Sequence, residues 1–553
     1  MVTHAKDKTV PPDLAVWHGT GPVRSRRPIY RNQLPPCNHA CPAGENIQAW
    51  LADAQAGRYE AAWRTLVRDN PLPAVHGRVC YHPCESACNR TSVDSAVSIH
   101  AVERFLGDLA IAQGWQLPQD AAPSGKKVLV VGAGPSGLSC AWQLKRRGHE
   151  VEIRDAGPLA GGMLHFGIPA YRLPRDVLQA EIHRLEQAGI NIVLNQKVED
   201  VLADMRHGGF NAAFIAIGAH ISRRADIPAR DCARVLDAVS FLRDVGLAAP
   251  PQIGRRVAIY GGGNTAMDAA RTARRLGAEE ALIIYRRDRE HMPAHAFEAD
   301  EALAEGIKIH WLRSIRDIAA DSLQVEVMQL DAEGRAQPTG RIENLAADTL
   351  ILALGQDIDS ALLQHLPGMR IKADGTVEVD ANMMTGYPGI FAGGDMVPSE
   401  RTVTVAVGHG KHAARCIDAW LAGARYERAP ARDTVGAERL HVWYLAETAR
   451  TREHLLDPTH RMHGFAEIVA SLNADEARFE AGRCFSCGNC FECDGCYAAC
   501  PEGAIQKLGP GRRYDIDYAR CTGCAACYEQ CPCHAIEMEA EPVAAEPATR
   551  ELP

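Results

Sequence analysis

The sequence predicts a multidomain protein with an α/β centre and a cysteine-rich domain at each end, the first of them α-helical. Two strand–glycine-turn–helix units, which begin at Val128 and Val257, indicate two Rossmann-like dinucleotide-binding domains in the centre. The cysteines gather at the two ends, with five between Cys37 and Cys88 and eleven between Cys484 and Cys533. The length of 553 residues leaves room for three or four domains of about 150 residues each.

Composition excludes several classes of function. Apolar residues make up 46% and charged residues 23%, which is ordinary for a globular protein and excludes a mostly disordered or coiled-coil chain. A net charge of −9 argues against a general nucleic-acid binder, which needs a basic face. No stretch approaches the roughly 20 apolar residues of a membrane span. The first ten residues contain no apolar core of a signal peptide, so we expect a cytoplasmic protein.

The cysteine content indicates iron–sulfur or metal sites. Nineteen cysteines in a cytoplasmic chain do not form a disulfide framework, because that compartment keeps thiols reduced. Their gathering at two ends favours bound metal or clusters instead. Cys140, Cys232 and Cys416 stand apart, and we interpret them as small buried apolar residues.

Composition and patterning divide the chain into six parts. A polar arm (1–36) precedes short helical patterns such as 47–51 and 101–112, and a linker at 122–127 leads into the α/β region. The boundaries we predict are 1–122 for a helical iron–sulfur domain, 123–240 with 347–424 for the first dinucleotide domain, and 241–346 for the second. A charged, largely helical connector (425–483), a ferredoxin-like domain (484–540) and a disordered tail (541–553) complete the chain.

The first glycine turn carries a complete dinucleotide fingerprint. Gly132, Gly134 and Gly137 fit G-x-G-x-x-G between a buried strand and a helix. They allow, in turn, a tight turn, close approach of a pyrophosphate, and close helix–strand packing. The following strand ends at Asp155, a carboxylate placed to accept hydrogen bonds from ribose hydroxyls.

The second glycine turn differs at the end of its second strand. Gly261, Gly263 and Ala266 fit the G-x-G-x-x-A variant. The strand that follows ends in Arg286 and Arg287 rather than in an acid, and two guanidinium groups suit a 2′-phosphate. We therefore expect NADP(H), with NAD(H) left open and a solvated arginine pair as the structural alternative.

Four segments around these turns identify a family. GGMLHFGIPAYRLPRDVL at 161–178, YGGGNTAMDAAR at 260–271, YRRDREHMPA at 285–294 and GIFAGGD at 389–395 resemble the glutamate synthase small-subunit family. That family includes the N-terminal half of dihydropyrimidine dehydrogenase and the large subunit of NADH-dependent ferredoxin:NADP oxidoreductase. The resemblance covers roughly residues 37–424 and implies FAD on the first unit and NAD(P)H on the second. Hydride transfer then occurs between cofactors, so no residue is assigned as a catalytic acid or base.

The resemblance also implies which residues hold the two nucleotides. Asp395 and the helix that starts at Thr402 close the FAD site, and Gly167, Ile168 and Pro169 are candidates for contact with the flavin ring. The full FAD set is Gly132, Gly134, Pro135, Ser136, Gly137, Asp155, Gly162, Gly167, Ile168, Gly394, Asp395, Thr402 and Val403. The NAD(P) set is Gly261, Gly263, Asn264, Thr265, Ala266, Arg286 and Arg287.

The C-terminal cysteines follow the spacing of bacterial two-cluster ferredoxins. Each of two runs reads C-x2-C-x2-C-x3-C-P, and in that pattern the fourth cysteine of each run ligates the other cluster. We expect one [4Fe-4S] cluster on Cys490, Cys493, Cys496 and Cys531, and another on Cys521, Cys524, Cys527 and Cys500. Zinc bound by CxxC pairs is the alternative, which the doubled run disfavours. Cys533 is surplus and is interpreted as structural.

The N-terminal cysteines depart from the family pattern. The family's leading CxxC pair is absent, and His76 stands where relatives often have a cysteine. By resemblance, Cys41, Cys80, Cys84 and Glu103 hold a cluster near the flavin. The alternative for Glu103 is an exposed helical residue.

Four further cysteines are then left over. Cys37 and Cys88 correspond to half of the family's second N-terminal cluster, and Cys484-x2-Cys487 has the spacing of the missing pair. These four could complete a bridging cluster within one chain or across a dimer, or they could be inert thiols. We expect three clusters, and a fourth cluster requires that these four cysteines lie close together in space.

These features favour an electron-transfer enzyme that moves electrons between NAD(P)H, FAD, the clusters and a protein partner. The resemblance offers as partners a 2-oxoacid:acceptor oxidoreductase, a dissimilatory sulfite reductase, a ferredoxin or a glutamate synthase large subunit. We therefore expect an oligomer or a complex subunit. The alternatives are a glutamate synthase small subunit, an electron-bifurcating flavoprotein and a non-catalytic scaffold subunit.

Overall fold

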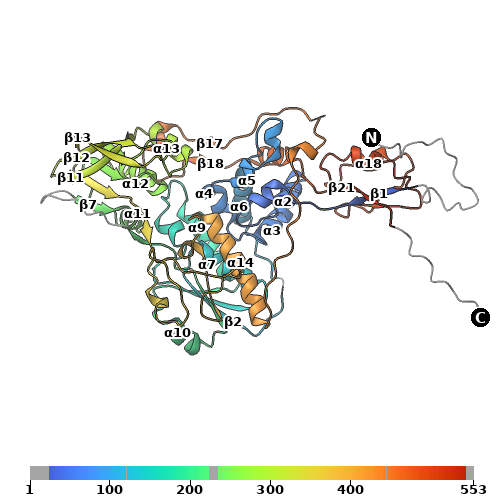
Figure 1. Ribbon diagram of the computed structural model, residues 1–553, viewed down its shortest axis with the longest axis horizontal. Helices are drawn as coiled ribbons and strands as arrows, with labels where there is room; N and C mark the ends of the chain where they lie inside the picture. The colour runs from blue at the N-terminus through green and yellow to red at the C-terminus, as the bar shows by residue number, and fades with distance from the viewer. Residues whose placement is uncertain (1–23, 120, 223–233, 444, 543–553) are drawn as a thin grey trace, which may run out of the picture.

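The computed structural model describes residues 24–119, 121–222, 234–443 and 445–542. Two α/β units lie on one side of a helical N-terminal domain, and the C-terminal domain projects from the other side (Figure 1). In the described part of the chain, no helix is both long and apolar enough to cross a lipid bilayer. Cys140 and Cys416 are buried, as predicted, whereas Cys232 lies outside the described residues.

The N-terminal domain is α-helical, as predicted. Its core contains Trp50, Leu51, Leu66 and Leu106, which are all buried. They come from three helices, each of which turns an apolar face inward. The elements are α1 (Pro36–Ala40), α2 (Ile47–Gln55), α3 (Tyr59–Val67), α4 (Pro73–Val79), α5 (Pro83–Ser86), the 3₁₀ turn η3 (Asn89–Ser92) and α6 (Ile99–Gln113). A Cβ on Gly107 would lie 2.3 Å from the Ala74 nitrogen, so α4 and α6 pack backbone to backbone.

The first α/β unit is a five-stranded parallel sheet with the order β16-β5-β2-β3-β4. Its central strands are apolar on both faces because helices cover both, which is typical of parallel sheets. The strands are β2 (Lys127–Val131), β3 (Glu150–Arg154), β4 (Asn191–Val193), β5 (Ala212–Ile215) and β16 (Ile390–Ala392). The helices are α7 (Pro135–Lys145), α8 (Met163–Phe166), α9 (Arg175–Gln187), α10 (Val201–Gly208) and α14 (Val403–Leu421), with 3₁₀ turns η4 (Ala361–Leu363) and η5 (Gly394–Met396).

The second unit has the sheet order β10-β9-β8-β14-β7. The strands are β7 (Arg234–Asp237), β8 (Arg256–Tyr260), β9 (Glu280–Tyr285), β10 (Lys308–Trp311) and β14 (Thr349–Leu352), with helices α11 (Ala238–Gly246), α12 (Asn264–Arg275) and α13 (Ala296–Ala304). An antiparallel sheet of β11 (Arg313–Ile318), β12 (Ser322–Leu330) and β13 (Ala336–Ala346) is inserted before β14. The short strands β6 (Ile221–Ser222) and β15 (Gln356–Asp357) pair where the chain passes between the units.

The structure corrects the predicted boundaries 241–346 of this second unit. Strand β7 and strand β14 both belong to its sheet, since β14 pairs in parallel with β7 and with β8. The unit therefore extends beyond 241–346 at both ends, from β7 to β14. The sequence pattern missed this because β14 returns after the inserted antiparallel sheet rather than next to its neighbours in sequence.

The connector (425–483) differs from the largely helical segment that we predicted. Its elements are the 3₁₀ turn η6 (Ala437–Arg439), the short strands β17 (His454–Leu455) and β18 (Val469–Ala470), the single turn α15 (Pro458–Arg461) and helix α16 (Ala474–Gly482). Only α16 is a helix of more than one turn in the described part. The rest runs over the N-terminal domain, where its backbone and charged side chains bond to that domain instead of to a helix of their own.

The C-terminal domain contains α17 (Gly495–Ala499), β19 (Ile505–Lys507), β20 (Tyr514–Ile516), α18 (Ala526–Glu529) and β21 (Ile536–Ala540). The N-terminal arm is not a separate surface segment in its described part. Strand β1 (Arg26–Tyr30) pairs antiparallel with β21, so these residues belong to the C-terminal domain rather than to the predicted domain 1–122 (Figure 1). Of the predicted tail 541–553, residues 543–553 lie outside the described residues, and Glu541 pairs with Arg24.

Candidate functional site: two nucleotide turns and four cysteine groups

The first glycine turn has the geometry of a phosphate cradle. Gly132 has a φ of +107°, and a Cβ there would lie 2.4 Å from the Ala216 carbonyl oxygen. A Cβ on Gly137 would lie 1.9 Å from the Gly132 oxygen, so that position must also be glycine. Gly134, by contrast, has no protein atom within 4 Å of its Cβ position. The turn is therefore open on the side where a pyrophosphate would approach helix α7.

The other predicted FAD residues surround this turn. Asp155 follows β3, and its carboxylate accepts hydrogen bonds from the Ala133 and Gly157 nitrogens, both at 2.7 Å. It thus ties the turn to the strand end and keeps lone pairs for a ribose. Gly162 lies beside Gly134, with its Cβ position 3.0 Å from the Gly134 Cα. The Ile168 carbonyl accepts a bond of 2.7 Å from Arg175, which fixes the loop that contains Gly167 and Pro169.

The segment after β16 closes the same site. A Cβ on Gly394 would lie 3.0 Å from the Ser136 Cβ, so the turn with Gly394 and Asp395 sits against the start of α7. Helix α14 then begins at Val403, capped by the Thr402 hydroxyl, which accepts from the Val405 nitrogen at 3.2 Å. The two segments that the sequence predicts to bind FAD, which are far apart along the chain, therefore lie together at one end of the first sheet.

The second turn repeats the cradle with different flanks. Gly261 has a φ of +150°, and its Cβ would lie 2.2 Å from the Ala353 oxygen, whereas Gly263 faces open space. Ala266 is buried in α12, with Thr265 before it. The Asn264 side chain is already engaged: it donates to the Tyr81 hydroxyl at 2.6 Å and accepts from the His295 nitrogen at 3.0 Å.

The two arginines after β9 are not equivalent. Arg287 is half-buried, and its Nε donates to the Tyr285 hydroxyl at 3.0 Å. Arg286 is exposed and forms no ion pair with any residue that the structure describes. Arg286 therefore points a charged group to solvent, while Arg287 is held against its own strand.

The first cysteine group lies between the N-terminal domain and α14. Burial is the largest cause that raises the pKa of Cys41, Cys80 and Cys84. Nearby carboxylates raise each pKa further, that of Cys80 to about 12, and Cys80 also repels charge on Cys41 and Cys84. Bound iron would supply the positive charge that stabilises the thiolates. The Thr404 hydroxyl donates to the Cys80 sulfur at 3.0 Å, which connects this group to the helix that closes the FAD site.

Glu103 is buried, not exposed, so the alternative interpretation of it as a surface helical residue is wrong. It accepts a bond of 2.9 Å from Asn70 and lies near Cys41 and Cys80. Glu45 and His76 lie within 4.8 Å of it, and burial lowers the pKa of His76 to about 3. A buried carboxylate near Cys41 and Cys80 fits a fourth ligand of one cluster.

The second group brings the two ends of the chain together. Cys37, Cys88, Cys484 and Cys487 line one pocket, together with residues of both ends of the chain. Burial, followed by repulsion from Cys484, Cys88 and Cys487, raises the pKa of Cys37 well above its ordinary value. Three half-buried thiols and the buried thiol of Cys487 around one pocket fit the four ligands of a cluster.

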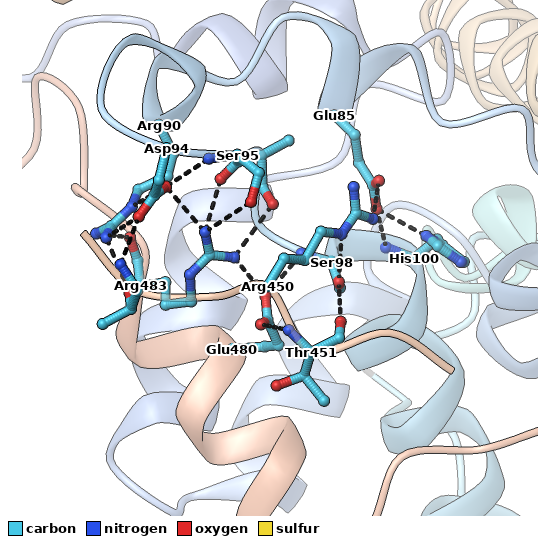
Figure 2. A network of polar contacts seen from close by, with 12 residues as sticks. Glu85, Arg90, Asp94, Ser95, Ser98, His100, Arg450, Thr451, Glu480 and Arg483 are labelled. Carbon is cyan, nitrogen blue, oxygen red and sulfur yellow. Dashed lines mark hydrogen bonds and ion pairs between the residues drawn. The ribbon is translucent and has the colours of Figure 1, made fainter. Parts of the chain in front are cut away.

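A polar network surrounds Arg483, the residue that precedes Cys484 in the chain (Figure 2). Arg483, next to Cys484, donates to Asp94 at 2.9 Å, to the Ser95 carbonyl at 2.7 Å and to Glu480 at 2.9 Å. Arg90 reaches the Arg483 carbonyl from the other side at 3.2 Å. The Arg90 guanidinium in turn holds the pKa of the Asp94 carboxyl well below its usual range. These bonds dock the end of the connector on the N-terminal domain.

Apolar packing supports the same docking. Leu472, Ala477 and Ala481 lie in one buried cluster with Trp50 and Leu51 of α2. Burial of such side chains contributes about 25 cal/mol for each Å² removed from water. The ends of a long loop therefore meet through packing and hydrogen bonds that need no bound cluster.

The C-terminal domain contains two further groups. Cys490, Cys493 and Cys496 each lie within electrostatic reach of Cys531, which belongs to the other run. Cys500, Cys521, Cys524 and Cys527 line a second pocket. Cys531 thus lies near the first run and Cys500 near the second, which are the positions that the crossed ligand prediction requires. Cys533 is buried, with its sulfur 3.8 Å from that of Cys531.

Comparison with known proteins agrees with this arrangement. The model of the pyridine nucleotide-disulphide oxidoreductase family matches residues 100–208 and 126–410. Residues 25–115 match the model described as dihydropyrimidine dehydrogenase domain II, 4Fe-4S cluster, and residues 489–535 match a 4Fe-4S dicluster domain.

Similar proteins of known name show more closely which family the chain belongs to. The chain is 37% identical to the NADP(+)-dependent formate dehydrogenase subunit beta of Moorella thermoacetica, over 81% of this chain and 70% of that protein. It is 34% identical to the NADPH-Fe(3+) oxidoreductase subunit beta of Geobacter sulfurreducens, over 70% of this chain and 63% of that protein. It is 32% identical to the glutamate synthase [NADPH] small chain of Escherichia coli, over 70% of this chain and 89% of that protein. The chain belongs to the glutamate synthase small-subunit-like iron–sulfur oxidoreductases.

Membership in this family establishes the class of chemistry. The chain is an FAD-dependent iron–sulfur NAD(P)H oxidoreductase, with FAD, NAD(P)H and [4Fe-4S] clusters as its cofactors. The open glycine turns and the grouped thiols of this structure fit those groups. The relatives are subunits of multi-subunit redox enzymes, and no partner of this chain follows from their names.

Sequence reasoning missed three residues at these sites. Thr404 was recognised only as part of a helix start, although it bonds to the Cys80 sulfur. Tyr81 follows Cys80 and bonds to Asn264 of the second unit. Tyr30 bonds to the Cys496 sulfur from the N-terminal arm. No spacing could have found Thr404 or Tyr30, because each contact joins segments more than 300 residues apart.

Proposed function

We propose that this protein takes electrons from NADPH and delivers them, through four cysteine-held clusters, to a protein partner that docks at the C-terminal domain. Bound at the first glycine turn, FAD would supply the chemistry that couples two-electron hydride exchange with nicotinamide to one-electron exchange with the clusters. The residues of the chain position the nucleotides and hold the clusters in sequence.

The observation that carries this proposal is the continuity of the four cysteine groups. Thr404 connects the helix over the FAD site to Cys80 of the first group. Cys84 of that group lies within electrostatic reach of Cys37 in the second. Gly488, next to Cys487, donates to the Cys533 carbonyl at 2.6 Å, beside the third group. Cys527 of the fourth group lies within reach of Cys496 of the third.

The proposed ligands of the clusters follow this order. The first group is Cys41, Cys80, Cys84 and Glu103, and the second is Cys37, Cys88, Cys484 and Cys487. The third is Cys490, Cys493, Cys496 and Cys531, and the fourth is Cys500, Cys521, Cys524 and Cys527. Glu103 is a harder ligand than thiolate, which separates the potential of the first cluster from those of the others.

The partner we propose is another redox protein. The resemblance points to a 2-oxoacid:acceptor oxidoreductase, a dissimilatory sulfite reductase, a ferredoxin or a glutamate synthase large subunit, and a formate dehydrogenase catalytic subunit joins them from the relatives' names. A ferredoxin-like domain that projects from the body supports a docked protein over a small-molecule acceptor (Figure 1).

A Cys493→Ser variant tests the exit of electrons. We expect NADPH-dependent dye reduction to survive, because hydride transfer occurs upstream, while reduction of an added ferredoxin is lost. Iron content and thermal melting of the variant control for misfolding. Retained ferredoxin reduction in a variant that lacks the third cluster would contradict the proposal.

Preference for NADPH depends on Arg286. An Arg286→Ala variant is expected to raise the KM for NADPH but not for NADH, because a charge-assisted contact contributes about 1.5–3 kcal/mol, roughly tenfold or more. Arg289→Ala is the matched control, since Arg289 is exposed nearby and pairs with Asp300. Equal effects of Arg286→Ala on both nucleotides, or a wild-type preference for NADH, would overturn the assignment.

A further inference from the structure

The N-terminal strand is built into the C-terminal domain along its whole described length. In the β1–β21 pairing, Tyr30 stands opposite Ile536. Arg24 forms an ion pair with Glu541 at 2.6 Å and donates to the Cys521 carbonyl at 2.8 Å. A Cβ on Gly523 would lie 2.3 Å from the Arg26 oxygen, so this strand fits directly against the loop of the second cysteine run.

Tyr30 ends this strand with its hydroxyl against a cysteine. The hydroxyl lies 3.2 Å from the Cys496 sulfur, and Cys496 is buried. The ring stacks on Tyr514, with centroids 6.3 Å apart and planes at 22°, which fixes its direction. A ligating cysteine is a thiolate without a proton, so in the loaded protein the phenol is the donor of this bond.

A hydrogen bond to a ligand sulfur changes the redox balance of a cluster. The donor draws charge from the sulfur, and the reduced cluster, which carries one more electron, gains more from it than the oxidised cluster. Hydrogen bonds to the sulfurs are among the factors that set cluster potentials.

We propose that Tyr30 is a redox-tuning residue, which raises the reduction potential of the cluster held by Cys490, Cys493, Cys496 and Cys531. The N-terminal strand thereby acts as part of the electron path, although 466 residues separate Tyr30 from Cys496. This inference rests on the proposed function only in taking Cys496 as a ligand.

The test is an EPR-monitored redox titration of Tyr30→Phe in the full, cluster-loaded protein. We expect the midpoint potential of one C-terminal cluster to move to more negative values, by the equivalent of a threefold to tenfold change in the reduction equilibrium, where tenfold is about 59 mV for one electron. Tyr518→Phe is the matched control, because the Tyr518 hydroxyl donates to the Pro28 carbonyl on the same strand. Its potentials should match those of the wild type.

Two further results keep the test decisive. If Tyr30→Phe loses iron, difluorotyrosine at position 30 keeps the ring and strengthens the donor, and the potential should then rise. A Tyr30 variant with full iron content and an unchanged potential would overturn the inference. A Cys496→Ser variant with full iron content would instead overturn the ligand assignment, so the two failures are distinguishable.

Discussion

The two cysteine-rich ends of the chain reach their arrangements by different routes. In the C-terminal domain, eight cysteines from two adjacent runs form two groups. The spacing within the runs is enough to predict that the fourth cysteine of each run joins the other group. In the N-terminal domain, Cys37 and Cys88 meet Cys484 and Cys487 from the far end, and Asn89 and Cys487, which bond there, are 398 residues apart. One end depends on local spacing and the other on docking of distant segments.

This difference places the vulnerable point of the proposed relay at the meeting of the two ends. The local groups need only their own domain to fold. The bridging group needs the connector to lie on the N-terminal domain, which the network of Arg90, Asp94, Glu480 and Arg483 secures (Figure 2). Substitutions at the two ends should therefore have different consequences.

The largest effect is expected for Cys37→Ser. Loss of one bridging ligand should leave NADPH-dependent dye reduction intact but reduce electron arrival at the C-terminal clusters to the background level. Rapid-freeze EPR after mixing with NADPH measures this directly. Cys140→Ala is the control, since Cys140 is buried in α7 outside all four groups. Normal arrival of electrons in Cys37→Ser would mean that the bridging group is not on the path.

A second prediction concerns docking without touching a thiol. Arg483→Met should destabilise the protein by about 3–5 kcal/mol, because it leaves the buried Glu480 carboxylate without its cationic partner, while Asp94 keeps Arg90. Iron content should fall below that of the wild type while the C-terminal signals persist. Arg64→Ala removes only an exposed ion pair with Glu60 and should change neither quantity measurably. Unchanged melting and iron content in Arg483→Met would show that the docking does not depend on this network.

The smallest effect is expected at the flavin side. Thr404→Val removes the bond to the Cys80 sulfur at nearly constant volume, so the cluster of the first group should become harder to reduce. Redox titration of that cluster measures the shift. Ser139→Ala, which removes a hydroxyl bonded to the Val407 carbonyl at the same helix contact, should leave the potential in place. Equal potentials in Thr404→Val and the wild type would show that Thr404 does not influence the potential of this cluster.

The same contrast explains how much the sequence could predict. Both glycine turns and both ferredoxin runs depend on spacing within one segment, so their geometry could be expected from the residues alone. The conformation of the connector could not, because its backbone bonds are made to residues such as Arg90 and Ser98 of another domain. The place of β1 was missed for the same reason, since its partner β21 lies at the other end of the chain. The boundary at β14 was hidden by the inserted sheet before it.

The measurement that tests the central claim most directly compares the iron content and Mössbauer spectrum of wild type with those of a Cys484→Ser, Cys487→Ser double variant. Four clusters of four irons require about sixteen irons per chain in the wild type and about twelve in the variant. The double variant should lose one cluster signal and keep the two from the ferredoxin runs. A wild type with about twelve irons, or a variant whose iron content and spectrum match the wild type, would contradict the bridging cluster.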